Sequence, residues 1–171
     1  SPYFFFKVLQ QFIKQYPDLA ELVKVEFVGT VPNWLLDMIK EFNLSSYVTL
    51  KGVLSHKDCI AFQNECDALL STSLKVIDGK DYCIAGKSYE YLYQQKPILA
   101  FMTEGSQKDF LEESGVSLIF DADESKKNVE QFKDFILGNV KFKPNKSFMK
   151  QINTKVTTEK LAHIIKKVVE K

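Results

Sequence analysis

Short apolar segments alternate with segments of helical period along most of this chain. Each apolar segment carries hydrophobic residues at consecutive rather than alternate positions, which is typical of a strand buried on both faces of a parallel sheet. The alternation predicts the α/β class: a Rossmann-like doubly wound parallel sheet of about five or six strands, with right-handed crossovers and helices on both faces. The expected strands are Val25–Gly29, Tyr47–Leu50, Asp67–Ser71, Ile98–Met102 and Val116–Phe120.

The segments between these strands have the period and the end signals of helices. Ser55 with Asp58 resembles a capping box, and Ser106 with Asp109 is expected to cap a later helix. Apolar residues at helical spacing predict a buried stripe in each helix, formed in the first by Phe5, Val8, Leu9, Phe12 and Ile13 and in the second by Leu35, Leu36 and Ile39. The expected helices are 2–16, 32–42, 55–65, 86–95, 106–113, a helix from Asp123 or Ser125 to Leu137, and one or two helices within 145–171; the segments 18–24, 73–84 and 138–144 are expected to connect them.

The stretch 85–92 places a glycine at the start of a helix that follows an irregular loop. Gly86 has no side chain to keep a ligand away from the backbone. The free amides of Lys87 and Ser88 lie at the positive end of the helix, where a phosphate is stabilised. Glu90 is close enough to that end to accept hydrogen bonds from a sugar diol. The stretch therefore indicates a nucleotide site, and more narrowly a site for a nucleoside diphosphate.

The same residues also fit an ordinary helix start. Glycine is common before a helix, and a Glu in the first turn stabilises a helix by about 0.3–1 kcal/mol without a ligand. The place of this stretch in the expected fold favours the ligand-binding interpretation. Gly29, Gly52, the loop from Ser73 and Gly86 all lie at or after the carboxyl end of an expected strand. Ligands bind at that edge of parallel sheets, so we expect these segments to border one crevice.

Composition narrows the class of protein. A chain of 171 residues with 45% hydrophobic residues can form one domain with a substantial core. The 23 basic and 22 acidic residues nearly balance, so no overall field attracts nucleic acid or anionic lipid. Cys59, Cys66 and Cys83 lack metal-ligand spacing and are odd in number, which indicates reduced thiols, a reducing compartment and no metal. No apolar run approaches the roughly 20 residues of a membrane span, and we expect a cytoplasmic protein.

Several short motifs follow one another along the chain: Val28-Gly29, 48–53 followed by Ser55-His56, 66–70, 86–92 and 96–100. In order and spacing these segments resemble the carboxyl-terminal domain of GT-B glycosyltransferases, in particular the large retaining group often called glycosyltransferase family 4 or group 1. The resemblance extends from about Phe4 to Phe120, and the run from Gly86 to Ala100 is its most specific part.

The resemblance implies a domain architecture. Residues 1–171 would form a single Rossmann-like domain, the donor-binding half of a two-domain enzyme. The amino-terminal acceptor domain, together with the first strand of this domain, would precede Ser1. The enzyme would transfer a sugar from a nucleotide-sugar to an acceptor, at the inner face of a membrane in many relatives, with no cofactor and no obligatory metal. The isolated domain is expected not to turn over.

The resemblance also implies roles for individual residues. Glu90 would hold the ribose hydroxyls, and the amides near Lys87 and Ser88 would face the diphosphate. The backbone around Val53 and Leu54 would frame the base. The loop 73–84 would approach the transferred sugar. Catalysis would be electrostatic, by amides and cations that stabilise the leaving diphosphate, and no side chain is assigned as a catalytic acid, base or nucleophile.

Two features depart from the family pattern. Many members have a second Glu eight positions before the one that matches Glu90, where this chain has Tyr82. The contact of that carboxylate with the sugar is therefore lost or replaced. The family's Arg and Lys for the diphosphate lie partly before Ser1, and Lys75, Lys80 and Lys87 are candidate substitutes.

Other interpretations remain open. The chain could be a non-catalytic nucleotide-sugar-binding or interaction module of the same fold, in which Tyr82 marks a lost sugar site, or a sugar-nucleotide epimerase. Phe4, Phe5 and Phe6 exceed the needs of one helix stripe, so they cover a neighbouring element or a partner. The basic residues Lys141, Lys143, Lys146 and Lys150 form a solvated surface or contact an anionic membrane face.

Overall fold

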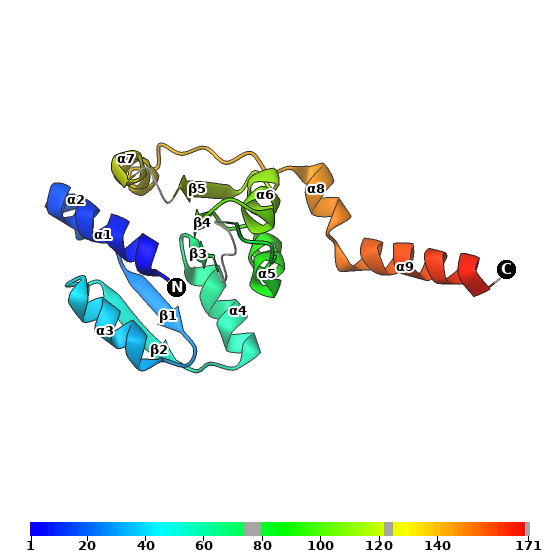
Figure 1. Ribbon diagram of the computed structural model, residues 1–171, viewed down its shortest axis with the longest axis horizontal. Coiled ribbons are helices and arrows are strands. Elements are labelled where there is room, and N and C mark those ends of the chain that lie inside the picture. Colours follow the sequence, from blue (N-terminus) through cyan, green and yellow to red (C-terminus); the bar gives the residue numbers. More distant parts are fainter. Residues whose placement is uncertain (74–79, 122–124, 170–171) are drawn as a thin grey trace.

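Helices and strands alternate in the computed structural model, which describes residues 1–73, 80–121 and 125–169 (Figure 1). Residues 74–79 of the expected loop, with Lys75, the possible helix start at Asp123 and the end of the chain at Lys171 lie outside these ranges. The elements are α1 (Tyr3–Gln15), α2 (Pro17–Ala20), β1 (Val25–Val28), α3 (Asn33–Glu41), β2 (Val48–Gly52), α4 (His56–Glu65), β3 (Leu69–Thr72), α5 (Gly86–Gln94), β4 (Ile98–Met102), α6 (Ser106–Glu113), β5 (Ser117–Asp121), α7 (Ser125–Ile136), α8 (Lys146–Gln151) and α9 (Thr154–Val169).

The described strands form two parallel sheets and not the single sheet of about five or six strands that the sequence predicts. One sheet has the order β1-β2, and the other has the order β3-β4-β5. The α/β class and the parallel pairing are confirmed, whereas the single sheet is wrong. An apolar segment identifies a strand by its own composition, but it does not encode which backbone lies beside it.

The two sheets are joined by side chains of α1. The ring of Phe5 packs edge-on against Phe101 of β4, with centroids 5.1 Å apart, and the ring of Phe6 packs against Phe27 of β1 at 6.0 Å. Phe5 and Phe6 are only 3% and 0% exposed. The excess of phenylalanine at the start of the chain therefore covers neighbouring strands of the same domain.

Two apolar cores lie on either side of the three-stranded sheet. The larger core contains residues of α1, α3 and α7 packed on β1, β2, β4 and β5, and it continues across both sheets. The smaller core lies between β4 with β5 and the helices α5, α6 and α8. Alternate residues of β4 enter opposite cores, Leu99 and Phe101 the larger and Ile98, Ala100 and Met102 the smaller, so this strand is buried throughout.

The helix ends follow the sequence signals in part. The Ser55 side chain accepts a hydrogen bond from the amide of Asp58 at 3.2 Å, which confirms the expected cap of α4. The expected cap by Ser106 with Asp109 is wrong, because α6 starts after Gly105 and its cap has no side-chain hydrogen bond. The connector expected over 18–24 begins as the short helix α2, with Pro17 in its first turn.

The expected apolar stripes are largely confirmed. In α1, the residues Phe5, Val8, Leu9 and Phe12 are buried and Ile13 is partly buried. In α3, Leu35 and Ile39 are buried, but Leu36 is 38% exposed and its expected inward position is wrong. Residues 35 and 39 are one turn apart, whereas Leu36 is rotated by about 100° from Leu35 and reaches the edge of the contact.

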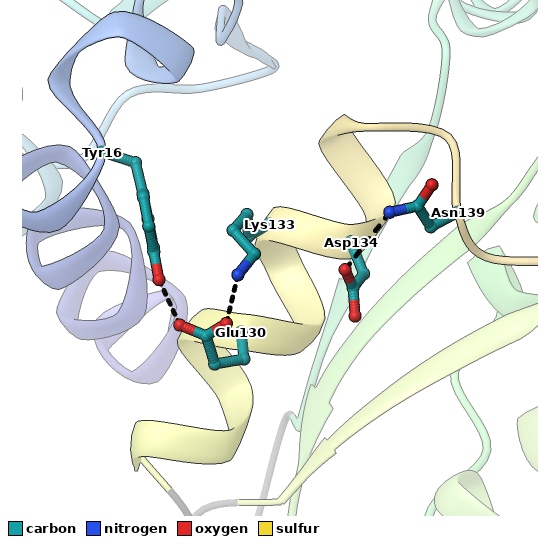
Figure 2. A network of polar contacts seen from close by, with 5 residues as sticks. All are labelled: Tyr16, Glu130, Lys133, Asp134 and Asn139. Atoms are coloured by element: carbon teal, nitrogen blue, oxygen red, sulfur yellow. Dashed lines mark hydrogen bonds and ion pairs between the residues drawn. The ribbon is translucent and has the colours of Figure 1, made fainter.

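Helices α1 and α7 are also connected by a polar network at the surface (Figure 2). Glu130 of α7 accepts a hydrogen bond from the hydroxyl of Tyr16, which follows α1, and forms an ion pair with Lys133. Lys133 and Tyr16 together lower the pKa of Glu130, and the carboxylate raises the pKa of Tyr16. Near the end of the same helix, Asn139 donates to Asp134 at 3.4 Å. This network is exposed, so we assign it an orienting role between two helices that the apolar core already holds.

A second charge cluster lies on β1. Oε1 of Glu26 is 3.0 Å from Nζ of Lys51 and 3.1 Å from Nζ of Lys24. Lys51 is the main cause that lowers the pKa of Glu26, and Lys24 adds to it. A depressed pKa in the folded chain stabilises the fold above the unfolded pKa of about 4.3, and this contribution is lost as the pH falls through the folded value.

We therefore expect Glu26→Gln to flatten the acid side of the stability curve. Urea unfolding of the parent chain between neutral pH and about pH 3 should show a larger loss of unfolding free energy than the variant shows. The control is Glu41→Gln, which removes an exposed carboxylate of α3 for which no ion pair is formed within the described residues. If the unfolding free energies of the parent and the Glu26→Gln chain changed in parallel with pH, the ion pairs of Glu26 would not be the source of the acid sensitivity.

Helix α9 ends the described part of the chain and extends away from the two sheets (Figure 1). None of its described residues is buried. Within the described ranges no helix combines the length and the apolar character needed to cross a bilayer.

Candidate functional site

The start of α5 is an open helix terminus. Ala85 precedes the helix in an extended conformation and offers no side chain to cap it. Within the described ranges the amides of Gly86 and Lys87 have no hydrogen-bond partner. A Cβ atom built on Gly86 would meet nothing within 4 Å, so open space lies beside these amides. An alanine cap costs about 1 kcal/mol relative to Ser, Asp or Asn, and no side chain offsets that cost at this helix end.

Ser88 differs from its expected role. Its amide donates to the carbonyl of Ala85 at 2.9 Å, so the expectation that the amides of Lys87 and Ser88 are both free is wrong for Ser88. The first turn of the helix is tight and closes on its own cap residue. The Ser88 side chain is 1% exposed, and its hydroxyl oxygen has no hydrogen-bond partner among the described residues.

Glu90 lies on the solvent side of α5. Gly86 and Glu90 are four residues apart, so they share one face of the helix, while Ser88 and Leu92 share a buried face. Lys87 and Glu90 are exposed. The structure therefore brings the glycine, the open amides and the carboxylate together within one turn of one helix.

A buried glutamine positions this helix start. Gln107 of α6 is 1% exposed; its Oε1 accepts from the amide of Ala85 at 2.8 Å, and its Nε2 donates to Oγ of Ser71 in β3 at 3.2 Å. One side chain thus links a strand, the neighbouring helix and the residue before α5. The sequence analysis missed Gln107, although it lies three and four residues before the buried Phe110 and Leu111, which places a polar residue on an apolar helix face.

We expect Gln107→Ala to lower the free energy of unfolding by about 1–3 kcal/mol, because it leaves the Ala85 amide and the Ser71 hydroxyl without their partner. Gln107→Glu keeps an acceptor for the amide and should recover part of the loss. Urea unfolding measures both, with Gln151→Ala as a control at an exposed glutamine. Equal stability of the Gln107→Ala and parent chains would show that the hydrogen bonds of Gln107 to Ala85 and Ser71 do not stabilise the fold.

The chain before α5 is anchored to the end of β4. Asp81 is 0% exposed and pairs with Gly105; its amide donates to the Glu104 carbonyl and its carbonyl accepts from the Ser106 amide, both at 2.8 Å. Its Oδ1 accepts from the amide of Cys83 at 3.0 Å. This carboxylate was also missed by the sequence analysis, and its complete burial means that it holds the loop and does not face solvent.

Three segments near the start of α5 each contain a buried polar atom without a hydrogen-bond partner among the described residues. These atoms are Oδ2 of Asp81, Oγ of Ser88 and Oγ1 of Thr103, the residue that follows β4. Thr103 is tied to the end of β3, because its amide donates to Oγ of Ser73 at 3.2 Å. A buried polar atom without a partner costs about 1–3 kcal/mol, so such a group calls for water or a ligand.

The other glycine segments form a second group. The amide of Gly29, after β1, donates to the carbonyl of Gly52 at 2.8 Å, so these two strand ends lie together. Val53 and Leu54 follow Gly52 and are 75% and 36% exposed. No hydrogen bond between described residues joins this group to the start of α5.

Helix α4 provides the nearest link between the two groups. The Gln94 side chain, in the last turn of α5, donates to the Gln63 side chain, in the last turn of α4, at 3.4 Å. α4 leads into β3 and α5 leads into β4, so both last turns lie near the amino ends of these strands. The first turns of both helices, and with them the segment before His56, lie away from that amino edge.

The remaining site candidates are exposed side chains. Tyr82 is 63% exposed, immediately after the buried Asp81. Lys80 and Lys87 are exposed, and Lys75 lies outside the described ranges. All 23 basic residues of the chain are lysines, so a diphosphate here would meet ammonium groups and amides and no guanidinium.

Potential metal ligands and cysteines were also placed by the structure. No group of three or more His, Cys, Asp or Glu side chains there is arranged to hold a metal ion. Cys59, Cys66 and Cys83 are free, and burial raises the pKa of the Cys66 thiol. The unpaired state of the cysteines agrees with the sequence prediction of reduced thiols.

Comparison of the chain with the models of known protein families and with curated proteins gives no significant match.

Proposed function

We propose that this chain is the nucleotide-sugar-binding domain of a GT-B-type glycosyltransferase and that it binds a nucleoside diphosphate at the start of α5. The observation that supports it most is the uncapped first turn of α5, where the amides of Gly86 and Lys87 have no hydrogen-bond partner within the described ranges. An anion at such a helix end gains both hydrogen bonds and the field of the helix dipole.

The chemistry follows from charge. The amides of Gly86 and Lys87, with the Lys87 ammonium group, would bind the diphosphate oxygens. Glu90, on the same helix face as Gly86, would accept hydrogen bonds from the two ribose hydroxyls. When the bond from the sugar to the diphosphate breaks, negative charge grows on the leaving diphosphate. Fixed amides and an ammonium group stabilise that charge more than they stabilise the intact donor, and this difference lowers the barrier.

A binding module without transferase activity is the second candidate. The observation that favours it is the position eight residues before Glu90, where Tyr82 is 63% exposed and the neighbouring carboxylate of Asp81 is fully buried. Such a module would bind the nucleotide and lack the carboxylate contact with the sugar.

Calorimetric titration of the chain with uridine diphosphate and guanosine diphosphate tests the binding proposal, and sugar transfer by a longer chain with its acceptor domain separates the two candidates. We expect one of the two nucleotides to bind. Binding of neither nucleotide would overturn the proposal. Binding with sugar transfer supports the enzyme, and binding without transfer supports the module.

We expect Glu90→Ala to weaken the binding of that nucleotide by roughly 10- to 100-fold, because two charge-assisted hydrogen bonds to the ribose are lost. Glu90→Gln keeps one acceptor oxygen, so its affinity for the nucleotide should lie between that of the parent and that of Glu90→Ala. The matched control is Glu41→Ala, which removes an exposed helical carboxylate from α3. Unchanged affinity in Glu90→Ala would show that this carboxylate does not hold the ribose.

A further inference from the structure

Ala85, the cap residue of α5, is held through its backbone on both sides. Its amide donates to Oε1 of Gln107 at 2.8 Å, and its carbonyl accepts from the amide of Ser88 at 2.9 Å. Because a trans peptide is planar, the N–H of Gly86 points opposite to the carbonyl of Ala85. These two hydrogen bonds therefore set the direction of the open amide of Gly86, away from the first turn.

Gln107 is itself fixed at its other end. Its Nε2 donates to Oγ of Ser71 in β3 at 3.2 Å, and both residues are buried. The amide of Ala85 is a donor, so the side-chain oxygen of Gln107 must face it and the side-chain nitrogen must face Ser71. The start of α6 is tied in turn to the carbonyl of Asp81, which accepts from the amide of Ser106 at 2.8 Å. The glutamine therefore has one orientation, between a strand of the sheet and the cap of α5.

The packing of α6 does not require a glutamine at position 107. Phe110 and Leu111, one turn later on the same helix, belong to the smaller apolar core, which an aliphatic side chain at position 107 would extend. A buried side-chain amide costs free energy unless it is hydrogen-bonded. The two partners of Gln107 are the cap residue of an open helix end and a strand of the sheet, so this polar side chain serves the geometry of that helix end.

We propose that Gln107 is the positioning residue of the diphosphate site. It is buried and does not contact the ligand; it holds the backbone of Ala85 so that the amides of Gly86 and Lys87 keep one direction before the diphosphate binds. Amides that already have their bound orientation lose no further freedom on binding, so the affinity is higher. The role rests on the proposed function, because it concerns the same helix end, and it names the residue on which the affinity of that end depends.

Calorimetry of single variants with uridine diphosphate and guanosine diphosphate tests this role. Gln107→Met keeps the length of the side chain and removes both hydrogen bonds, and it should weaken the binding of the nucleotide that the parent binds by roughly tenfold. Ser71→Ala removes only the far anchor of Gln107 and should weaken binding by about two- to fivefold. The titrations are made at a temperature at which circular dichroism shows every variant to be folded.

Gln63→Met is the matched control, because Gln63 holds the opposite end of the same helix. This glutamine is also buried, in the last turn of α4, and its side chain accepts from that of Gln94, in the last turn of α5, at 3.4 Å. The control should lower stability in urea and leave the affinity for the nucleotide unchanged. A purely structural role of Gln107 predicts that both methionine variants lose stability and that neither loses affinity.

Equal binding of the nucleotide by the parent and by Gln107→Met would leave the site in place and overturn the positioning role. Equal weakening by Gln63→Met would overturn it as well, because the loss would then follow from any disturbance of α5. If Gln107→Met does not fold, Ser71→Ala decides, and an affinity equal to that of the parent would contradict the role. A parent chain that binds neither nucleotide overturns the proposed function, and the role of Gln107 with it.

Discussion

Gly105→Ala is expected to lower the free energy of unfolding by at least about 3 kcal/mol, the range of mutations that force a backbone apart. A Cβ atom on Gly105 would lie 1.9 Å from the carbonyl oxygen of Asp81, and the residue has a φ of +140°, which side chains rarely allow. The contact is with backbone, so no rotamer change relieves it. The pairing of Asp81 with Gly105 would have to break, and the anchor of the chain before α5 would break with it.

Gly86→Ala is the matched control for this prediction. It adds the same methyl group at the start of α5, where nothing lies within 4 Å and φ is not positive. Alanine exceeds glycine in helix propensity by up to about 1 kcal/mol, so stability should stay equal or rise. Urea unfolding of the two variants beside the parent chain measures the difference. If both variants unfold at the same urea concentration, the close approach of Gly105 to Asp81 does not exist in solution.

Ala85→Asp is expected to raise the stability of the chain and to abolish nucleotide binding, with an affinity loss of about a hundredfold or more. An aspartate at the cap of α5 can accept from the open amides and interact with the helix dipole, which adds about 0.5–2 kcal/mol. The same carboxylate occupies the binding site proposed for the diphosphate and repels the diphosphate by its negative charge. A change that stabilises the fold and destroys binding separates the site from the scaffold.

Ala85→Asn separates charge from occupancy in this experiment. Asparagine caps a helix about as well as aspartate but carries no charge. Both variants should unfold at higher urea concentrations than the parent, and the asparagine variant should keep more affinity for the nucleoside diphosphate in calorimetry. If the aspartate variant bound the nucleoside diphosphate as tightly as the parent, the diphosphate would not bind at the start of α5.

The local part of the candidate site could be predicted from the sequence. The helix start at Gly86 and the spacing from Gly86 to Glu90 depend on residues within one turn of each other, and β4 has the predicted bounds. The helical period fixes which residues share a face, so the side on which Glu90 lies relative to Ser88 follows from spacing alone.

The supports of the site could not be predicted in the same way. Gln107 reaches Ser71, 36 residues away in the chain, and Ala85, 22 residues away. Asp81 is held by the residues around Gly105. Such contacts join side chains and backbone from segments that become neighbours only when the sheet forms. The expected free amide of Ser88 failed for a related reason, since the tight first turn on Ala85 is a detail of backbone geometry.

The sequence by itself determined the α/β class, the order of the strands and of the helices other than α2, and the apolar faces of most helices, because periodicity and end signals act between residues close in the chain. Only the tertiary structure decided that β1 with β2 and β3 with β4 and β5 form separate sheets, that Phe5 and Phe6 join them, and that Gln107 sets the start of α5. These features depend on which backbones and side chains meet across long sequence separations, and no local pattern of residue types encodes that choice.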